Sequence, residues 1–173
     1  MKTILFILPA LQEVLSAKFR QIKYSLFPPL SLLTLAGLVS PDKYNLIVRD
    51  EHVEDIFIDE PVELVVMTVY ISSAKRAYEI SSFYRERGSK VFMGGIHPST
   101  MAEEALLHSD SICIGPGESV FLQMLSDFET NKLQKIYYGD KLTDLSEVPL
   151  ARRDLMNKDR YLVPNTIVAS RGC

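Results

Sequence analysis

Short apolar runs separated by polar and Gly- or Pro-containing turns recur along the first 140 residues. They predict strands over residues 3–8, 44–48, 64–69, 90–93 and 111–114. Most of these runs are continuous and do not alternate with polar residues, which is typical of strands covered on both faces. The pattern therefore predicts a mostly parallel, five-stranded sheet.

Helical periodicity lies between the predicted strands. Leucines after Pro28-Pro29 predict a buried helix, and residues 73–87 carry apolar side chains at helical spacing. Thr100-Met101-Ala102-Glu103 has the spacing of a capping box, and residues 118–129 predict a further helix. This alternation is typical of a doubly wound α/β domain, flavodoxin-like or Rossmann-like, with the expected strand order 2-1-3-4-5.

The regular pattern ends near Asp140. Residues 141–164 mix acidic residues, arginines and prolines without a clear period, so we interpret them as a linker. A new apolar run, Asn165 to Ala169, then predicts a strand close to the last residue. We therefore divide the sequence into an α/β domain over 1–140, a linker over 141–164 and a further strand within 165–173.

Charge and cysteine content narrow the function. The formal net charge of -3 provides no basic field for a phosphate backbone, which argues against nucleic acid as a partner. The apolar run at residues 3–8 is short, meets Pro9 and lacks the cleavage site of a signal peptide, and the stretch at 26–39 is too short for a membrane span. Cys113 and Cys173 are far apart, which favours a reducing, cytoplasmic location over a disulfide framework. We expect a cytoplasmic protein without a membrane span.

In an open α/β sheet, ligands bind beyond the carboxyl ends of the strands, near the point where strand order reverses. The loop after the first strand, residues 9–12, contains neither a G-x-G-x-x-G fingerprint nor a P-loop. Thr68 and Tyr70 stand where a phospho-receiver domain would carry its acceptor Asp. These absences argue against dinucleotide binding, nucleotide hydrolysis and a phospho-receiver function.

Two glycine-containing loops are the best candidate ligand contacts. Gly94-Gly95 either lets a ligand lie against the backbone or forms a tight turn that needs positive φ. Gly115-Pro116-Gly117 offers backbone N–H groups beside a helix start. The candidate binding residues at the strand ends are Thr68, Tyr70, Ser72, Gly94, Gly95, His97, Pro98, Gly115, Gly117 and Glu118.

The three histidines carry different expectations. His108 lies near the end of a predicted helix and is interpreted as a solvated charge. His52 lies in a run of acidic residues, which is more typical of a solvated charged loop than of a metal site. His97 follows the paired glycines, so ligand contact and loop packing both remain open.

Five motifs together resemble the N-terminal cobalamin-binding domain of B12-dependent radical S-adenosylmethionine enzymes, a group that includes anaerobic cyclases of magnesium-protoporphyrin IX monomethyl ester. They are Phe27-Pro28-Pro29-Leu30, Gly94 to Pro98, Gly115 to Glu118, Val148 to Asp154, and Ser170 to Cys173. The resemblance implies that the domain binds and positions cobalamin, while the cofactor carries the chemistry. It implies methyl transfer or cyclase chemistry in a full-length protein that also uses a [4Fe-4S] cluster and S-adenosylmethionine.

The resemblance also gives the C-terminal residues a role. In such enzymes Ser-Arg-Gly-Cys ends the first strand of the radical barrel, and its Cys begins a C-x-x-x-C-x-x-C cluster motif. This implies that 165–173 is the first strand of a truncated barrel and that Cys173 is the first cluster ligand, with the catalytic barrel as the domain's partner. One thiolate cannot hold a cluster, so we expect the fragment itself to be catalytically inert.

The sequence lacks the motif that supplies a histidine as the lower axial ligand of cobalt in a related group of B12 domains. Methionine-synthase-type B12 domains carry D-x-H-x-x-G after the first strand, where this sequence has Pro9-Ala10-Leu11-Gln12. Asp50-Glu51-His52 matches the first three letters but follows the second strand. We therefore expect no histidine ligand. The alternative function is a non-catalytic, flavodoxin-like ligand-sensing or protein-interaction domain.

Overall fold

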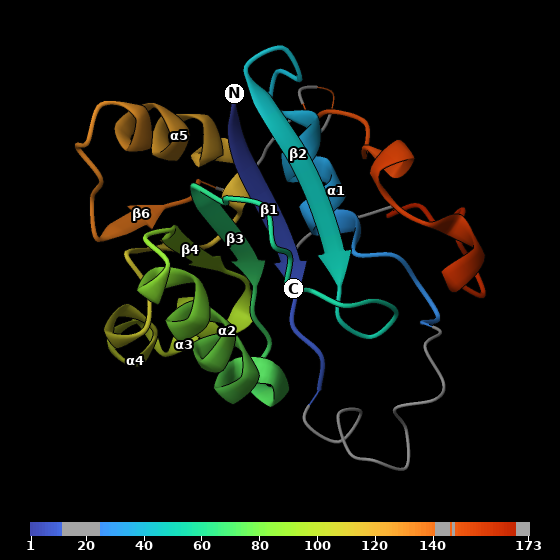
Figure 1. The fold of residues 1–173 in the computed structure, drawn as a ribbon, viewed down its shortest axis with the longest axis horizontal. Helices are drawn as coiled ribbons and strands as arrows, with labels where there is room; N and C mark the ends of the chain where they lie inside the picture. The colour runs from blue at the N-terminus through green and yellow to red at the C-terminus, as the bar shows by residue number, and fades with distance from the viewer. Residues whose placement is uncertain (12–24, 141–145, 147, 169–173) are drawn as a thin grey trace.

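The protein is a three-layer α/β domain, seen here in a computed structural model that describes residues 1–11, 25–140, 146 and 148–168 (Figure 1). A six-stranded parallel sheet has the order β2-β1-β3-β4-β5-β6. Its strands are β1 (Lys2–Leu8), β2 (Tyr44–Asp50), β3 (Leu64–Thr68), β4 (Lys90–Gly94), β5 (Ser111–Ile114) and β6 (Ile136–Tyr138). The predicted order 2-1-3-4-5 is confirmed.

The sixth strand, β6, extends the predicted five-stranded sheet. It pairs with β5 through Ile112 and Ile136, Cys113 and Tyr137, and Ile114 and Tyr138. Only Tyr137 is buried among its three residues, and the Tyr137 hydroxyl donates to Asp127 at 2.7 Å. A strand this short, with one buried side chain, has too little pattern to be distinguished from a turn.

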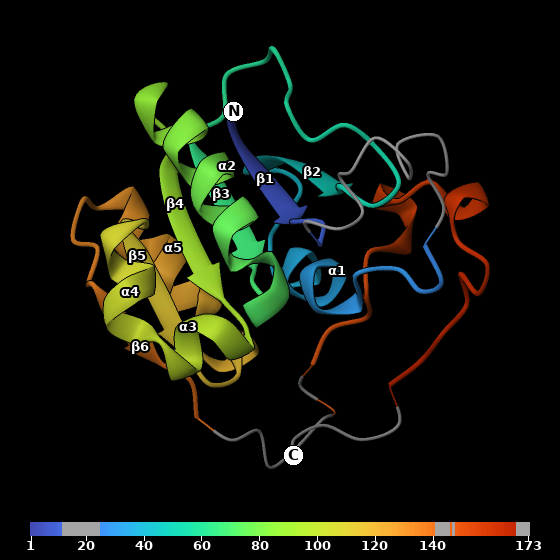
Figure 2. The same ribbon diagram turned by 90° about the horizontal axis from the view of Figure 1, so that it is seen from below.

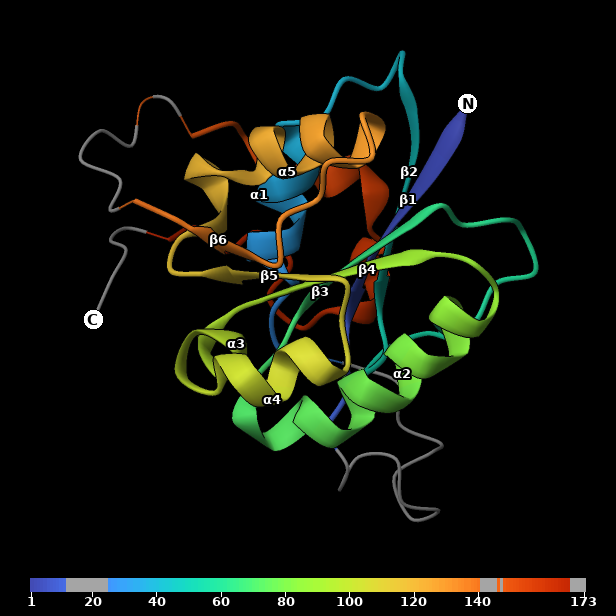
Figure 3. The ribbon, with the colours of Figure 1, turned by 90° about the vertical axis from the view of Figure 1, so that its left-hand side faces the viewer.

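Helices cover both faces of the sheet (Figure 3). The helices are α1 (Leu30–Gly37), α2 (Ala74–Glu86), α3 (Ile96–Thr100), α4 (Ala102–Leu107) and α5 (Phe121–Glu129). Helices α1 and α5 lie on one face, and α2, α3 and α4 lie on the other. Phe6 and Phe121 pack in the first core, while Met67 and Tyr84 pack in the second. Burial on both faces explains the continuous apolar runs of the strands.

The segment directly after the Gly94-Gly95 turn is already helical. Gly95 has φ of 101°, which lets the chain turn sharply at the strand end before α3 begins at Ile96. The expected capping box at Thr100 does not form, because the Thr100 hydroxyl donates to the carbonyl oxygens of Ile96 and His97 instead. Helix α4 then begins after Met101 without a side-chain cap.

Residues 148–163, which we name the strap, pack against the α/β domain and do not form a free linker. The strap lies beside β2 and α1 on the right of Figure 1 and includes two 3₁₀ turns, Arg153–Leu155 and Lys158–Arg160. The Arg152 backbone N–H donates to the Leu33 carbonyl at 3.0 Å. The buried Tyr161 side chain donates its hydroxyl proton to Asp50 at 3.3 Å. Much of the expected linker is therefore fastened to the α/β domain.

The further strand expected within residues 165–173 is not present in the residues that are described there. Residues 165–168 lie in no strand, and 169–173, including Cys173, lie outside the described residues. The first barrel strand and its cluster ligand therefore stay predictions. Across the described ranges, no helix is both long and apolar enough to cross a membrane.

Candidate functional site

A cleft of about 200 Å³, open to solvent, lies between the sheet and the α1 and α5 face. Figure 2 looks toward the carboxyl ends of the strands, the side on which ligands bind in such sheets. Six residues predicted from sequence line this cleft: Thr68, Gly94, Gly95, Gly115, Gly117 and Glu118. The fold thus brings together the ends of β3, β4 and β5 as the sequence analysis expected.

The opposite wall of the cleft comes from residues that the sequence analysis did not select. They are Ser31 and Leu35 of α1, Pro116, and Phe121 and Met124 of α5, with Cys113 of β5 on the sheet side. The hydroxyls of Ser31 and Thr68 lie 3.5 Å apart, which links α1 to β3. A mostly apolar cleft with a few hydroxyls is typical of a small-molecule binding site.

The cleft glycines divide into two kinds. At Gly94, an added Cβ would meet only Cys113, at 3.8 Å, and at Gly117 it would lie 3.6 Å from Leu35, both ordinary contacts. Gly95 and Gly115 have φ of 101° and 87°, and an added Cβ would approach backbone oxygens to 2.9 and 2.8 Å. Gly95 and Gly115 are therefore required by the backbone, whereas Gly94 and Gly117 keep space open in the cleft.

Cys113, inside β5, contributes a buried thiol to the cleft wall. Burial raises the pKa of Cys113 to about 11. The thiol is therefore protonated at neutral pH and is a poor nucleophile. It shapes the cleft without offering reactive chemistry.

His97 is not among the residues that line the cleft. Its side chain is buried on the α2 face, with Nε2 2.6 Å from the Tyr78 hydroxyl. The Tyr78 hydroxyl in turn donates to Glu104 at 3.1 Å, so His97 Nε2–H is the donor to Tyr78. The buried Nδ1 of His97 has no hydrogen-bond partner among the described residues. Burial, followed by Glu104, raises the pKa of Tyr78. Of the two readings left open for His97, loop packing is the one that its position supports.

The other predicted residues also lie outside the cleft. Pro98 is buried beside His97 in α3, and Ser72 is exposed in the turn before α2. Tyr70 is exposed and lines a separate groove with Leu8 and Pro29. Ser31 borders both this groove and the cleft, so the two surfaces are continuous at the carboxyl edge of the sheet.

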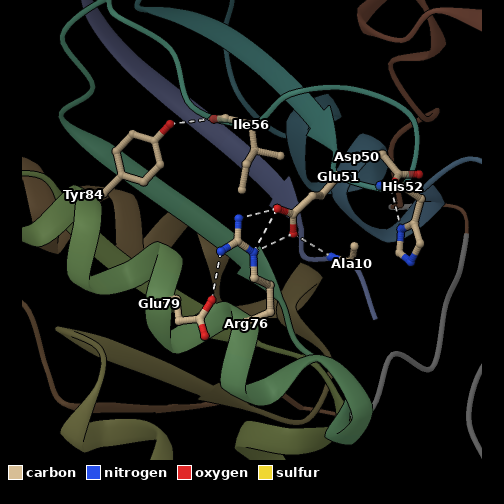
Figure 4. Close-up of polar contacts among 8 residues, drawn as sticks. All are labelled: Ala10, Asp50, Glu51, His52, Ile56, Arg76, Glu79 and Tyr84. Carbon is tan, nitrogen blue, oxygen red and sulfur yellow. Dashed lines mark hydrogen bonds and ion pairs between the residues drawn. The ribbon is translucent and has the colours of Figure 1, made fainter. Parts of the chain in front are cut away.

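The acidic run at the end of β2 is not a solvated loop, contrary to expectation (Figure 4). The Asp50 side chain is fully buried and accepts from His52 Nδ1 at 2.7 Å. Glu51 is 7% exposed, accepts from Arg76 Nη2 at 2.6 Å and accepts from the Ala10 backbone at 3.0 Å. This network holds the segment after β1 against β2 and α2. Within the described ranges, no group of His, Cys, Asp or Glu side chains could hold a metal ion.

Two bacterial methyltransferases resemble this chain in sequence. Bacteriochlorophyllide d C-8(2)-methyltransferase of Chlorobaculum tepidum is 31% identical over 154 residues, which cover 84% of this chain and 34% of that enzyme. The C-12(1)-methyltransferase of the same organism is 29% identical over 153 residues, covering 84% and 33%. The chain thus spans about a third of the length of these curated relatives.

A solved structure and a family model define the relationship further. The cobalamin-dependent S-adenosylmethionine radical enzyme OxsB, solved with aqua-cobalamin bound, superposes with a TM-score of 0.61 at 17% identity over 88% of this chain and 24% of OxsB. That likeness supports the fold. The model of the B12 binding domain matches residues 24–125. Because this match spans more than half of the 173 residues, the chain belongs to the B12-binding domain family.

Proposed function

We propose that this domain binds cobalamin and that the cleft accepts the nucleotide tail of the cofactor. The observation that carries the proposal is the pair of glycines, Gly94 and Gly117, which line the cleft and leave space in it although neither positive φ nor a close backbone contact requires them. Membership of the B12-binding family supplies the identity of the ligand.

The residues of the cleft fit such a group. The sheet side presents apolar side chains and Gly94, against which an aromatic base can lie flat. The hydroxyls of Ser31 and Thr68 offer hydrogen bonds to the polar part of the tail. Leu8 and Pro29 extend the apolar surface along the neighbouring groove toward the exposed carboxyl edge, where a larger part of the cofactor can be covered.

In the whole protein, the domain positions cobalamin for a radical S-adenosylmethionine barrel. Bound cobalamin supplies methyl-transfer or related organometallic chemistry. The two bacteriochlorophyllide methyltransferases favour a methyltransferase, while anaerobic cyclase chemistry remains compatible with the sequence motifs. Cys173 is proposed as the first ligand of the barrel's [4Fe-4S] cluster, and the barrel as the domain's partner.

Titration with hydroxocobalamin, followed by calorimetry and visible absorbance, tests the proposal. We expect saturable heat and a spectral change for the wild-type chain. Gly94→Val should abolish both, because its methyl groups would fill the cleft, whereas Ser82→Val on the exposed face of α2 should bind normally. The absence of heat and spectral change in the wild type would favour the ligand-sensing or protein-interaction module instead.

A further inference from the structure

One hydroxyl group joins the two glycine turns of the cleft. Ser99, in α3, donates from Oγ to the Gly95 carbonyl at 2.8 Å. The same oxygen accepts from the Gly115 backbone N–H at 3.1 Å. A serine hydroxyl has one proton and two lone pairs, so both hydrogen bonds form at once. Ser99 thus connects the loop after β4 to the loop after β5.

This link lies beyond the end of the strand pairing. The β4 and β5 ladder includes Phe92 with Ser111 and Met93 with Ile112, and pairs no later residue. Beyond these pairs, Gly94 and Gly95 at the end of β4 and Gly115 after β5 all line the cleft. The Ser99 side chain connects the two segments there.

Thr100, the next residue, shows what an ordinary helical hydroxyl does in the same helix. Its hydroxyl donates to the carbonyls of Ile96 and His97, both within α3, and among the described residues it makes no hydrogen bond to the loop after β5. Ser99 has the equivalent bond to a carbonyl four residues earlier and, in addition, the bond from Gly115. The added bond is therefore specific to position 99. Thr100 provides a matched control in the same helix.

We propose that Ser99 is a positioning residue that sets the separation of the Gly95 and Gly115 turns and thereby the affinity of the cleft for the nucleotide part of cobalamin. This inference rests on the proposed function. Ser99 is not among the cleft-lining residues, so it acts through the two turns rather than by ligand contact. Because Gly115 is exposed, water can replace a lost acceptor there, and stability should depend little on Ser99.

The test compares hydroxocobalamin with cobinamide, which keeps the corrin ring and lacks the nucleotide. Ser99→Ala should weaken cobalamin binding by roughly 3- to 10-fold, the range expected for one lost hydrogen bond, and leave cobinamide binding unchanged. Ser99→Thr keeps the hydroxyl and should restore the affinity. Thr100→Ala should bind both ligands as the wild type does. Hydrogen exchange at the Gly115 amide should quicken in Ser99→Ala alone.

The outcomes separate this inference from the proposed function. Normal cobalamin affinity in Ser99→Ala, or an equal loss for cobalamin and cobinamide, would overturn the inference while wild-type binding upholds the function. An equal loss in Thr100→Ala would also overturn it, because the effect would then belong to α3 as a whole. If the wild type binds no cobalamin, the proposed function is wrong, and the inference that Ser99 sets cobalamin affinity is wrong as well. Unchanged Gly115 exchange would overturn the structural part independently of any ligand.

Discussion

Replacing Arg76 by Met should destabilise the domain by leaving a buried carboxylate without its cation. Arg76 donates to Glu51 from Nε at 2.9 and 3.2 Å and from Nη2 at 2.6 Å. Hydrogen bonding to Glu51 raises the pKa of Arg76, which shows that the pair favours the charged guanidinium. Without Arg76, the hydrogen bond from the Ala10 N–H would remain for a Glu51 side chain that is only 7% exposed.

The expected magnitude follows from burial. Removing one partner of a buried ion pair costs about 3–5 kcal/mol. Arg76 is 17% exposed, so water can relieve part of the cost and we expect a loss at the low end, about 3 kcal/mol. For a domain of this size, such a loss lowers the melting temperature by about 6–12 °C.

Urea denaturation followed by circular dichroism measures this loss. Arg85→Met is the matched control in the same helix, because Arg85 is 40% exposed and its contact with Asp110 is 3.4 Å long. The control should cost less than about 1 kcal/mol. Adding Glu51→Gln to Arg76→Met should recover stability, since a neutral amide is cheaper to bury than a charge. The reasoning is refuted if Arg76→Met costs no more than the control, or if Glu51→Gln brings no recovery.

Two further predictions concern the cleft and the cobalt. In a Cys173→Ser background, thiol labelling of Cys113 should be slow at pH 8, and its rate should rise about tenfold per pH unit toward the Cys113 pKa of about 11. Bound cobalamin should slow the labelling further, because Cys113 lines the cleft. Rapid labelling at neutral pH would contradict the buried thiol. His52→Ala and His97→Ala should leave the electron paramagnetic resonance spectrum of bound cob(II)alamin unchanged, because His52 follows the edge strand β2 and His97 points to α2; loss of nitrogen splitting in either variant would identify that residue as a ligand.

The sheet and the position of the cleft could be predicted because both depend on local pattern. Strands buried on both faces need continuous apolar runs, and these are visible in β1 and β3. The carboxyl ends of parallel strands meet at one edge, so Gly94, Gly115 and Gly117 could be assigned to one site from sequence order alone.

The features that sequence analysis missed depend on contacts between distant residues or on the direction of one side chain. Glu51 is buried by Arg76, and no local pattern near Glu51 indicates that partner. The strap is fastened when Tyr161 reaches Asp50, across 111 positions. His97 stands two residues after Gly95, but the helix that begins at Ile96 turns its ring toward Tyr78 and away from the cleft.

Gly94 provides an argument for a ligand that does not depend on family resemblance. A glycine inside a strand or helix costs about 0.5–1 kcal/mol relative to alanine, and Gly94 has neither positive φ nor a close neighbour that requires it. Gly94→Ala should therefore raise the free energy of unfolding of the ligand-free domain by about that amount while weakening cobalamin binding. Urea denaturation and calorimetry measure the two effects. Destabilisation without loss of affinity would mean that Gly94 serves the fold and that its open space serves no ligand.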